Sequence, residues 1–102
     1  MTETKVVHVH HAPYDAYVGR KGWGFLHDSP FHKPRGMGGH TGRENAIIEF
    51  AIYWFSPAQQ PLRKMALESL AGKTLACWCA PLWCHADIIA GYLNWKNSKE
   101  RR

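Results

Sequence analysis

The stretch "KTLACWCAPLWCHADIIAGYLNWK", residues 73–96, carries the strongest structural signal in this chain. Its first part, "KTLACWC", is a short apolar run of the kind found in buried strands of parallel sheets. A turn at Pro81 follows. The next part, "CHADIIAGYLNWK", predicts a helix whose inner stripe is formed by Ala86, Ile89, Ala90 and Leu93. A strand that leads into a packed helix is typical of an α/β fold.

Further strands are predicted near the N-terminus. In "KVVHVHH", residues 5–11, the valines alternate with histidines, so that Val7 and Val9 lie on one side and His8 and His10 on the other. Residues 17–18 are predicted to be extended, and the glycines that follow them indicate a loop.

Two helices are predicted between these strands. The first has the spacing of a capping box at Thr41 and Glu44, runs through "NAIIEFAIYWF" and stops at Pro57. Because this segment is apolar almost all round, we expect it to be largely buried, covering a sheet or a dimer partner. The second is "PLRKMALESLAG", with Gly72 just past its end. Its predicted inner face consists of Leu62, Met65, Ala66, Ser69 and Leu70.

These elements predict one small α/β domain at residues 1–95, a sandwich in which a short, mainly parallel sheet is flanked by helices. Residues 96–102 are expected to form a charged C-terminal tail. With 102 residues, of which 45% are hydrophobic and 21% charged, the chain is long enough for one globular domain and too short for two. The formal net charge of +5 favours anionic partners, although a charge of this size also serves solubility alone.

No apolar run approaches the roughly 20 residues that span a membrane, and the N-terminal segment has no apolar region typical of a signal peptide. We therefore expect no membrane partner and a cytoplasmic location. Three cysteines are an odd number, which argues against a closed disulfide framework and leaves reduced thiols for metal or redox chemistry.

All three cysteines lie in "CWCAPLWCHAD", and this motif has three interpretations. As a zinc site, it offers Cys77 and Cys79 on one face of a strand, followed after a short loop by Cys84 and His85. As a reactive site, it places Cys84 at a helix N-terminus beside His85, with Asp87 orienting or capping. As ordinary core, its cysteines serve as small apolar side chains.

The zinc interpretation has an alternative ligand. The spacing differs from that of ordinary zinc knuckles, and the adjacent Cys84 and His85 are sterically awkward as joint ligands, so that His10 is an alternative. If "KVVHVHH" and "KTLACWC" run parallel, then His10, Cys79 and Cys84 lie toward the same carboxyl edge of the sheet. An edge that also holds a helix N-terminus suits an anion.

Candidate ligand contacts also lie in "YVGRKGWGF", residues 17–25. Gly19 permits close approach of a ligand, Arg20 clamps a phosphate or carboxylate, and Trp23 stacks on a base. The alternative is an ordinary glycine-rich turn, since the segment matches no nucleotide-binding fingerprint.

Over roughly residues 6–93 the chain resembles the domain of unknown function 4326 family of bacterial and phage proteins. The segments that carry this resemblance are, in order, "YDAYVGR", "WG", "SPF" and "LESLAGKTLACWCAPLWCHADIIAGYL". By this resemblance, the family's signature positions are Tyr17, Gly19, Arg20, Trp23, Gly24, Pro30, Phe31, Cys77, Cys79, Pro81, Cys84, His85 and Asp87. The chain departs from the family in "WGFLHDSPF", which inserts residues and lacks the asparagine expected before proline. The resemblance implies that the two motifs form one site, which adds Tyr17 and Gly24 to the ligand contacts, but it brings no activity.

Two functions remain open. The first is a pocket at the strand ends that binds, and in one version processes, an anionic nucleotide-like small molecule. There, Arg20 and the helix N-terminus hold charge, Trp23 or Trp78 stacks, and Cys84 with His85 supplies reactivity. The second is a zinc-stabilised, non-catalytic interaction module that binds nucleic acid or a host protein. The sequence decides neither the ligand, nor enzymatic activity, nor the oligomeric state.

Overall fold

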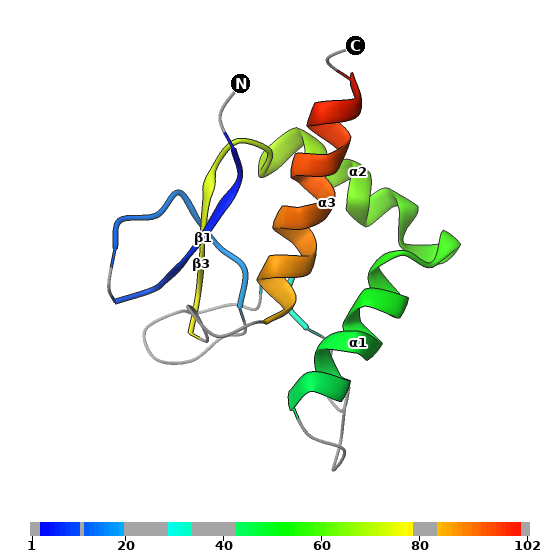
Figure 1. The fold of residues 1–102 in the computed structure, drawn as a ribbon, viewed down its shortest axis with the longest axis horizontal. Helices are drawn as coiled ribbons and strands as arrows, with labels where there is room; N and C mark the ends of the chain where they lie inside the picture. The colour runs from blue at the N-terminus through cyan, green and yellow to red at the C-terminus, as the bar shows by residue number, and fades with distance from the viewer. Residues whose placement is uncertain (1–2, 11, 20–28, 34–42, 79–83, 101–102) are drawn as a thin grey trace.

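The computed structural model describes residues 3–10, 12–19, 29–33, 43–78 and 84–100. In chain order the elements are β1 (Lys5–His8), β2 (Ala16–Tyr17), α1 (Arg43–Trp54), the 3-10 helix η1 (Pro57–Gln59), α2 (Gln60–Ser69), β3 (Thr74–Cys77) and α3 (His85–Glu100). Three helices and a three-stranded parallel sheet confirm the predicted α/β class (Figure 1).

The central strand of the sheet is β3. The strand order is β1-β3-β2, and both neighbours run parallel to β3. The register pairs Leu75 with Val6 on one side and with Ala16 on the other. Leu75 and Ala76 are fully buried, as expected for a central parallel strand without polar alternation. The prediction of at least two parallel strands is therefore confirmed.

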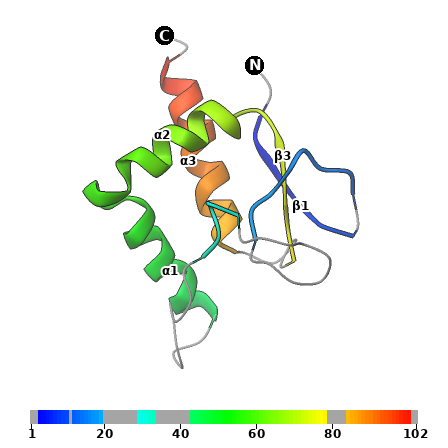
Figure 2. The same cartoon turned by 180° about the vertical axis from the view of Figure 1, so that it is seen from behind.

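The domain is packed around α3. This helix contacts β1, β3, α1 and α2, and Figures 1 and 2 show it between the sheet and the other two helices. Its predicted inner stripe is confirmed, since none of the four residues is more than 6% exposed: Ala86, Ile89, Ala90 and Leu93. At its other end α3 continues to Glu100, so the helix includes the beginning of the charged segment 96–102.

The prediction that α1 is largely buried is wrong for one side of the helix. Phe50 and Trp54 are fully buried, whereas Ile48, Ile52 and Phe55 are 49%, 69% and 53% exposed. Among the elements of the described chain, α3 is the one that packs extensively against α1, so one face of α1 is covered, while Ile48 and Ile52 lie on the open side together with exposed polar residues such as Glu49. The helix ends at Trp54, before Pro57 begins η1, as expected. Its predicted capping residue, Thr41, lies outside the described residues.

The inner face of α2 differs in two positions from the prediction. Ala66 and Leu70 are buried, and Leu62 packs against the core, but Met65 is 44% exposed and Ser69 is exposed as well. Leu67 also packs against the core, so the covered face of α2 turns toward Leu67 and leaves Met65 and Ser69 on its exposed side.

Hydrogen bonds at the ends of the elements fix the connections. Gly72 has φ 78°, a left-handed conformation that favours glycine, and directs the chain from α2 into β3. Its N–H donates to Thr4 Oγ1 over 2.8 Å. Asn94 of α3 binds the backbone of Thr4 twice, accepting its N–H over 2.7 Å and donating to its carbonyl over 3.0 Å. The start of the chain is thereby joined to both α2 and α3.

Candidate functional site

The structure describes about half of the predicted site. Arg20, Trp23, Gly24 and Cys79 lie outside the described residues. The described members are Tyr17, Gly19, Cys77, Cys84, His85 and Asp87, together with the alternative ligand His10.

The carboxyl ends of the three strands meet at one edge of the sheet. Parallel pairing places His8 opposite Cys77 and Tyr17 opposite Ala76. The N-terminus of α3, at His85, returns to Cys77, because the Cys84 and Cys77 sulfurs are in contact. Such an edge is where open α/β sheets place their ligands. The expected convergence of both motifs is thus supported for the residues that are described.

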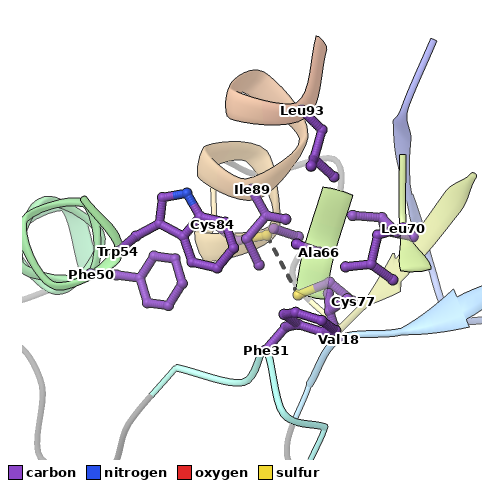
Figure 3. Packing of buried hydrophobic residues seen from close by; sticks show 12 residues of the cluster. Val18, Phe31, Phe50, Trp54, Ala66, Leu70, Cys77, Cys84, Ile89 and Leu93 are labelled. Atoms are coloured by element: carbon purple, nitrogen blue, oxygen red, sulfur yellow. Dashed lines mark hydrogen bonds between the residues drawn. The ribbon is translucent and has the colours of Figure 1, made fainter. Parts of the chain in front are cut away.

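The closest grouping of potential ligand atoms consists of Cys77, Cys84 and His85. One ligand atom from each residue lies within 4.8 Å of the others. The Cys84 thiol lies 3.4 Å from the Cys77 sulfur (Figure 3). All three residues are buried, with exposed fractions of 3%, 2% and 8%. The prediction that these three residues lie together is therefore confirmed, whereas His10 is not part of the group.

A sulfur separation of 3.4 Å is much longer than a disulfide bond, for which about 2.05 Å is required. Two thiolates on one tetrahedral zinc ion, each bound at about 2.3 Å, lie about 3.8 Å apart. The observed distance between the two sulfurs is therefore close to the distance between two sulfurs that share a zinc ion. For all three atoms to bind one ion, the largest distance between them, 4.8 Å, would have to shorten by about 1 Å. Figure 3 shows that Val18 and Phe31 flank the Cys77 sulfur, so apolar groups surround this cluster.

The imidazole of His85 is fixed by groups from two other segments. Nε2 lies 2.8 Å from the carbonyl oxygen of Val18, and the ring meets Phe50 edge-on with centroids 5.2 Å apart. Because a carbonyl accepts only, Nε2 carries the hydrogen, and the neutral ring then has its lone pair on Nδ1. This arrangement resembles the second shell of metal-binding histidines, which commonly donate their other nitrogen to a carbonyl. The sequence contained no signal for this partner, because Val18 contributes a backbone atom.

Asp87 acts on the backbone of the same turn. Its Oδ2 accepts the N–H of Cys84 over 2.9 Å, which is one half of a capping box at the start of α3. This contact matches the capping role proposed for Asp87 from the sequence. The assignment of Cys84, His85 and Asp87 as catalytic residues stays a prediction.

A second group of side chains surrounds Trp78. Its Nε1 donates to the Tyr17 hydroxyl over 2.9 Å, and the His10 and His8 rings meet the indole edge-on at 4.8 and 6.0 Å. A side chain at Gly19 would place its Cβ 2.3 Å from the Tyr17 hydroxyl, so the tyrosine ring would have to move to make room for it. The proposed ligand approach at Gly19 is therefore not needed to explain this residue.

Within the described ranges, no helix is both long and apolar enough for a membrane span. The family model "Domain of unknown function (DUF4326)" matches residues 3–95. The chain is also similar to the "Uncharacterized 12.4 kDa protein in nrdA-td intergenic region" of Enterobacteria phage T4, with 33% identity over 73 residues, covering 66% of this chain and 68% of the relative. No solved structure matches the chain significantly. The chain therefore belongs to the domain of unknown function 4326 family.

Proposed function

We propose that this chain is a zinc-binding α/β domain in which Cys77, Cys84 and His85 hold the ion where the end of β3 meets the start of α3. The observation that carries this proposal is the approach of three ligand atoms to within 4.8 Å of one another. Two thiols and an imidazole form a donor set that favours zinc over magnesium or calcium, which prefer oxygen ligands.

The burial of the cluster favours a structural role for the ion. Structural zinc sites are closed by four protein ligands, whereas catalytic sites keep one position open for water or substrate. Cys77 and Cys84 are at most 3% exposed, and His85 is 8% exposed. A fourth ligand is available in the sequence at Cys79, two residues after Cys77. In this role the ion joins the end of β3 to the start of α3 and stabilises the surrounding surface, which would bind a partner.

The proposal is tested by metal analysis of untagged protein after zinc loading and dialysis. We expect about one zinc per chain in the wild type and little in Cys77→Ser or Cys84→Ser, because two of the proposed ligands are sulfurs. His10→Ala is the matched control, since His10 is exposed and lies outside the cluster. Retention of zinc by both cysteine variants, with loss in His10→Ala, would place the metal on the N-terminal histidines instead. The same assay on Cys79→Ser tests the fourth ligand.

A second candidate function is favoured by the rings around Trp78. His8, His10, Tyr17 and Trp78 lie where the parallel strands end, which suits an aromatic, anionic ligand such as a nucleotide. A titration with mononucleotides, followed by tryptophan fluorescence, tests this function. We expect at least tenfold weaker binding in Trp78→Leu and no change in Trp95→Leu, where an exposed tryptophan of α3 is replaced. Equal binding by wild type and Trp78→Leu would exclude Trp78 as the contact.

A further inference from the structure

The side of the molecule formed by α1 and α3 carries a continuous apolar surface, which we call the apolar face. It consists of Ile48, Ile52, Phe55, Tyr92 and Trp95. Ile48, Ile52, Phe55 and Trp95 are between 49% and 69% exposed, and Tyr92 is half-buried. The cores of soluble domains cover most such side chains, and a cluster of this kind marks an interaction surface more often than single exposed residues do.

Ring contacts and helical spacing connect the members of the apolar face. Ile48 and Ile52 are four residues apart on α1, and Phe55 follows directly after the helix, where its N–H still donates to the Ala51 carbonyl, so the three residues form one ridge. Phe55 meets Tyr92 with ring centroids 5.8 Å apart, and Tyr92 meets Trp95 at 6.3 Å. The ridge of α1 therefore continues onto α3 without a polar gap.

A groove of about 450 Å³ lies beside this ridge. It is lined by Phe55, Asp87, Ile88, Gly91, Tyr92 and Trp95. Along α3 these residues span two helical turns, or about 12 Å. Among the described residues of this lining, Asp87 is the one that carries a charge. The described lining is therefore almost entirely apolar.

Gly91 in this groove is not explained by close contact with any residue that the structure describes. It lies within α3, where glycine costs about 1 kcal/mol relative to alanine. A Cβ built on Gly91 meets nothing within 4 Å, so no neighbouring group requires the residue to be small. A binding partner that approaches the backbone of α3 closely would explain why residue 91 has no side chain.

We propose that the apolar face binds the same face of a second copy of this chain, with the Ile48 and Ile52 ridge of each copy entering the groove of the other. A two-fold axis makes both contacts identical, which is how most homodimers pair. The ridge and the groove are both present on one face, so the pairing needs no further element. It would also provide the close approach that Gly91 permits.

The area available fits weak association of two copies. The exposed fractions of Ile48, Ile52, Phe55 and Trp95 correspond to about 500 Å² of open surface per copy, which is less than the roughly 800 Å² of a standard interface. The total of about 1,000 Å² in a symmetric pair lies at the lower end for a specific interface. A small molecule in the groove would leave Ile48 and Ile52 uncovered, because neither residue lines it.

Sedimentation equilibrium of the full chain tests the proposal. We expect the mass to rise from 11.7 kDa toward twice that value as the concentration approaches about 100 μM. Ile52→Gln should weaken association at least tenfold, since it places a polar side chain in the centre of the ridge. Met65→Gln is the matched control, because Met65 is a similarly exposed apolar residue on α2 outside the apolar face.

Gly91→Gln separates an effect on association from an effect on folding. The longer side chain blocks the groove, but it also replaces glycine by a better helix former. We therefore expect weaker association together with a higher unfolding temperature of the monomer. A wild-type mass of 11.7 kDa at every concentration, or equal weakening by Met65→Gln and Ile52→Gln, would overturn the proposal and assign the face to a partner of another sequence.

Discussion

Replacing Asn94 by alanine removes the side chain that fastens the start of the chain to α3. Asn94 accepts the Thr4 N–H over 2.7 Å and donates to the Thr4 carbonyl over 3.0 Å. Thr4 is only 2% exposed, so its backbone groups have little access to water once the amide is removed. The start of β1 depends on this anchor, because Thr4 directly precedes the strand.

The cost of Asn94→Ala follows from these contacts. A buried backbone group without a partner costs about 1–3 kcal/mol, and Asn94 is half-buried, which favours the lower end for each group. Alanine is the better helix former by about 0.6 kcal/mol, which offsets part of the loss. The net loss of unfolding free energy is about 1.4 kcal/mol, corresponding to a fall in Tm of roughly 6–11 °C for a domain of this size.

Thermal and urea unfolding, followed by circular dichroism, measure this loss. Asn97→Ala is the control, because Asn97 is the same residue type on the same helix, is also half-buried and takes no part in the contact with Thr4. Because it shares the gain in helix propensity and loses no hydrogen bond to Thr4, it should raise the unfolding free energy by at most about 0.6 kcal/mol. If Asn94→Ala matches Asn97→Ala within that margin, the argument from the two hydrogen bonds is refuted.

Four further substitutions test single features of the fold. Gly72→Ala should lower the unfolding free energy by about 1–2 kcal/mol, because the φ of Gly72 is 78°. Gly91→Ala should raise the unfolding free energy of the monomer by about 0.5–1 kcal/mol. Changes of the same sign in both variants would contradict this. Asp87→Ala should lower stability by about 1 kcal/mol through loss of the α3 cap, with no change in zinc content; a parallel loss of zinc would show that the carboxylate serves the metal site. Arg63→Met removes the guanidinium that donates to the carbonyls of Trp54, at the end of α1, and Ser56. Urea unfolding should report a loss of about 1 kcal/mol, with an unchanged midpoint as the contrary result.

The sequence predicts the buried residues of an element most accurately where that element is covered on several sides. The apolar run of β3 predicts a central parallel strand, and the stripe of α3 predicts its packed face, because both patterns are imposed by the core. The prediction is less accurate for α1, whose composition is apolar all round although one face is open. Burial of an apolar side chain is favourable in free energy, but the hydrophobicity of a segment does not show whether the surface that covers it belongs to the same chain.

The candidate site was predictable to the extent that it depends on side chains close in sequence. The proximity of Cys77, Cys84 and His85 follows from a strand, a short connection and a helix that returns to the strand. The hydrogen bond from His85 to the Val18 carbonyl and the one from Trp78 to Tyr17 join residues more than 60 positions apart. Local patterns carry no information on such pairs, since they result from the order of the strands in the sheet.

Metal analysis of the untagged chain, purified without added zinc or chelator, bears most directly on the proposed zinc site. We expect about one zinc per chain, released by a thiol-modifying reagent and absent from Cys77→Ser and Cys84→Ser. The contradicting result is that the same protein still holds less than about 0.1 zinc per chain after it has been loaded with zinc and dialysed, with all three thiols free in denaturant. That result would identify the cluster as part of the apolar core.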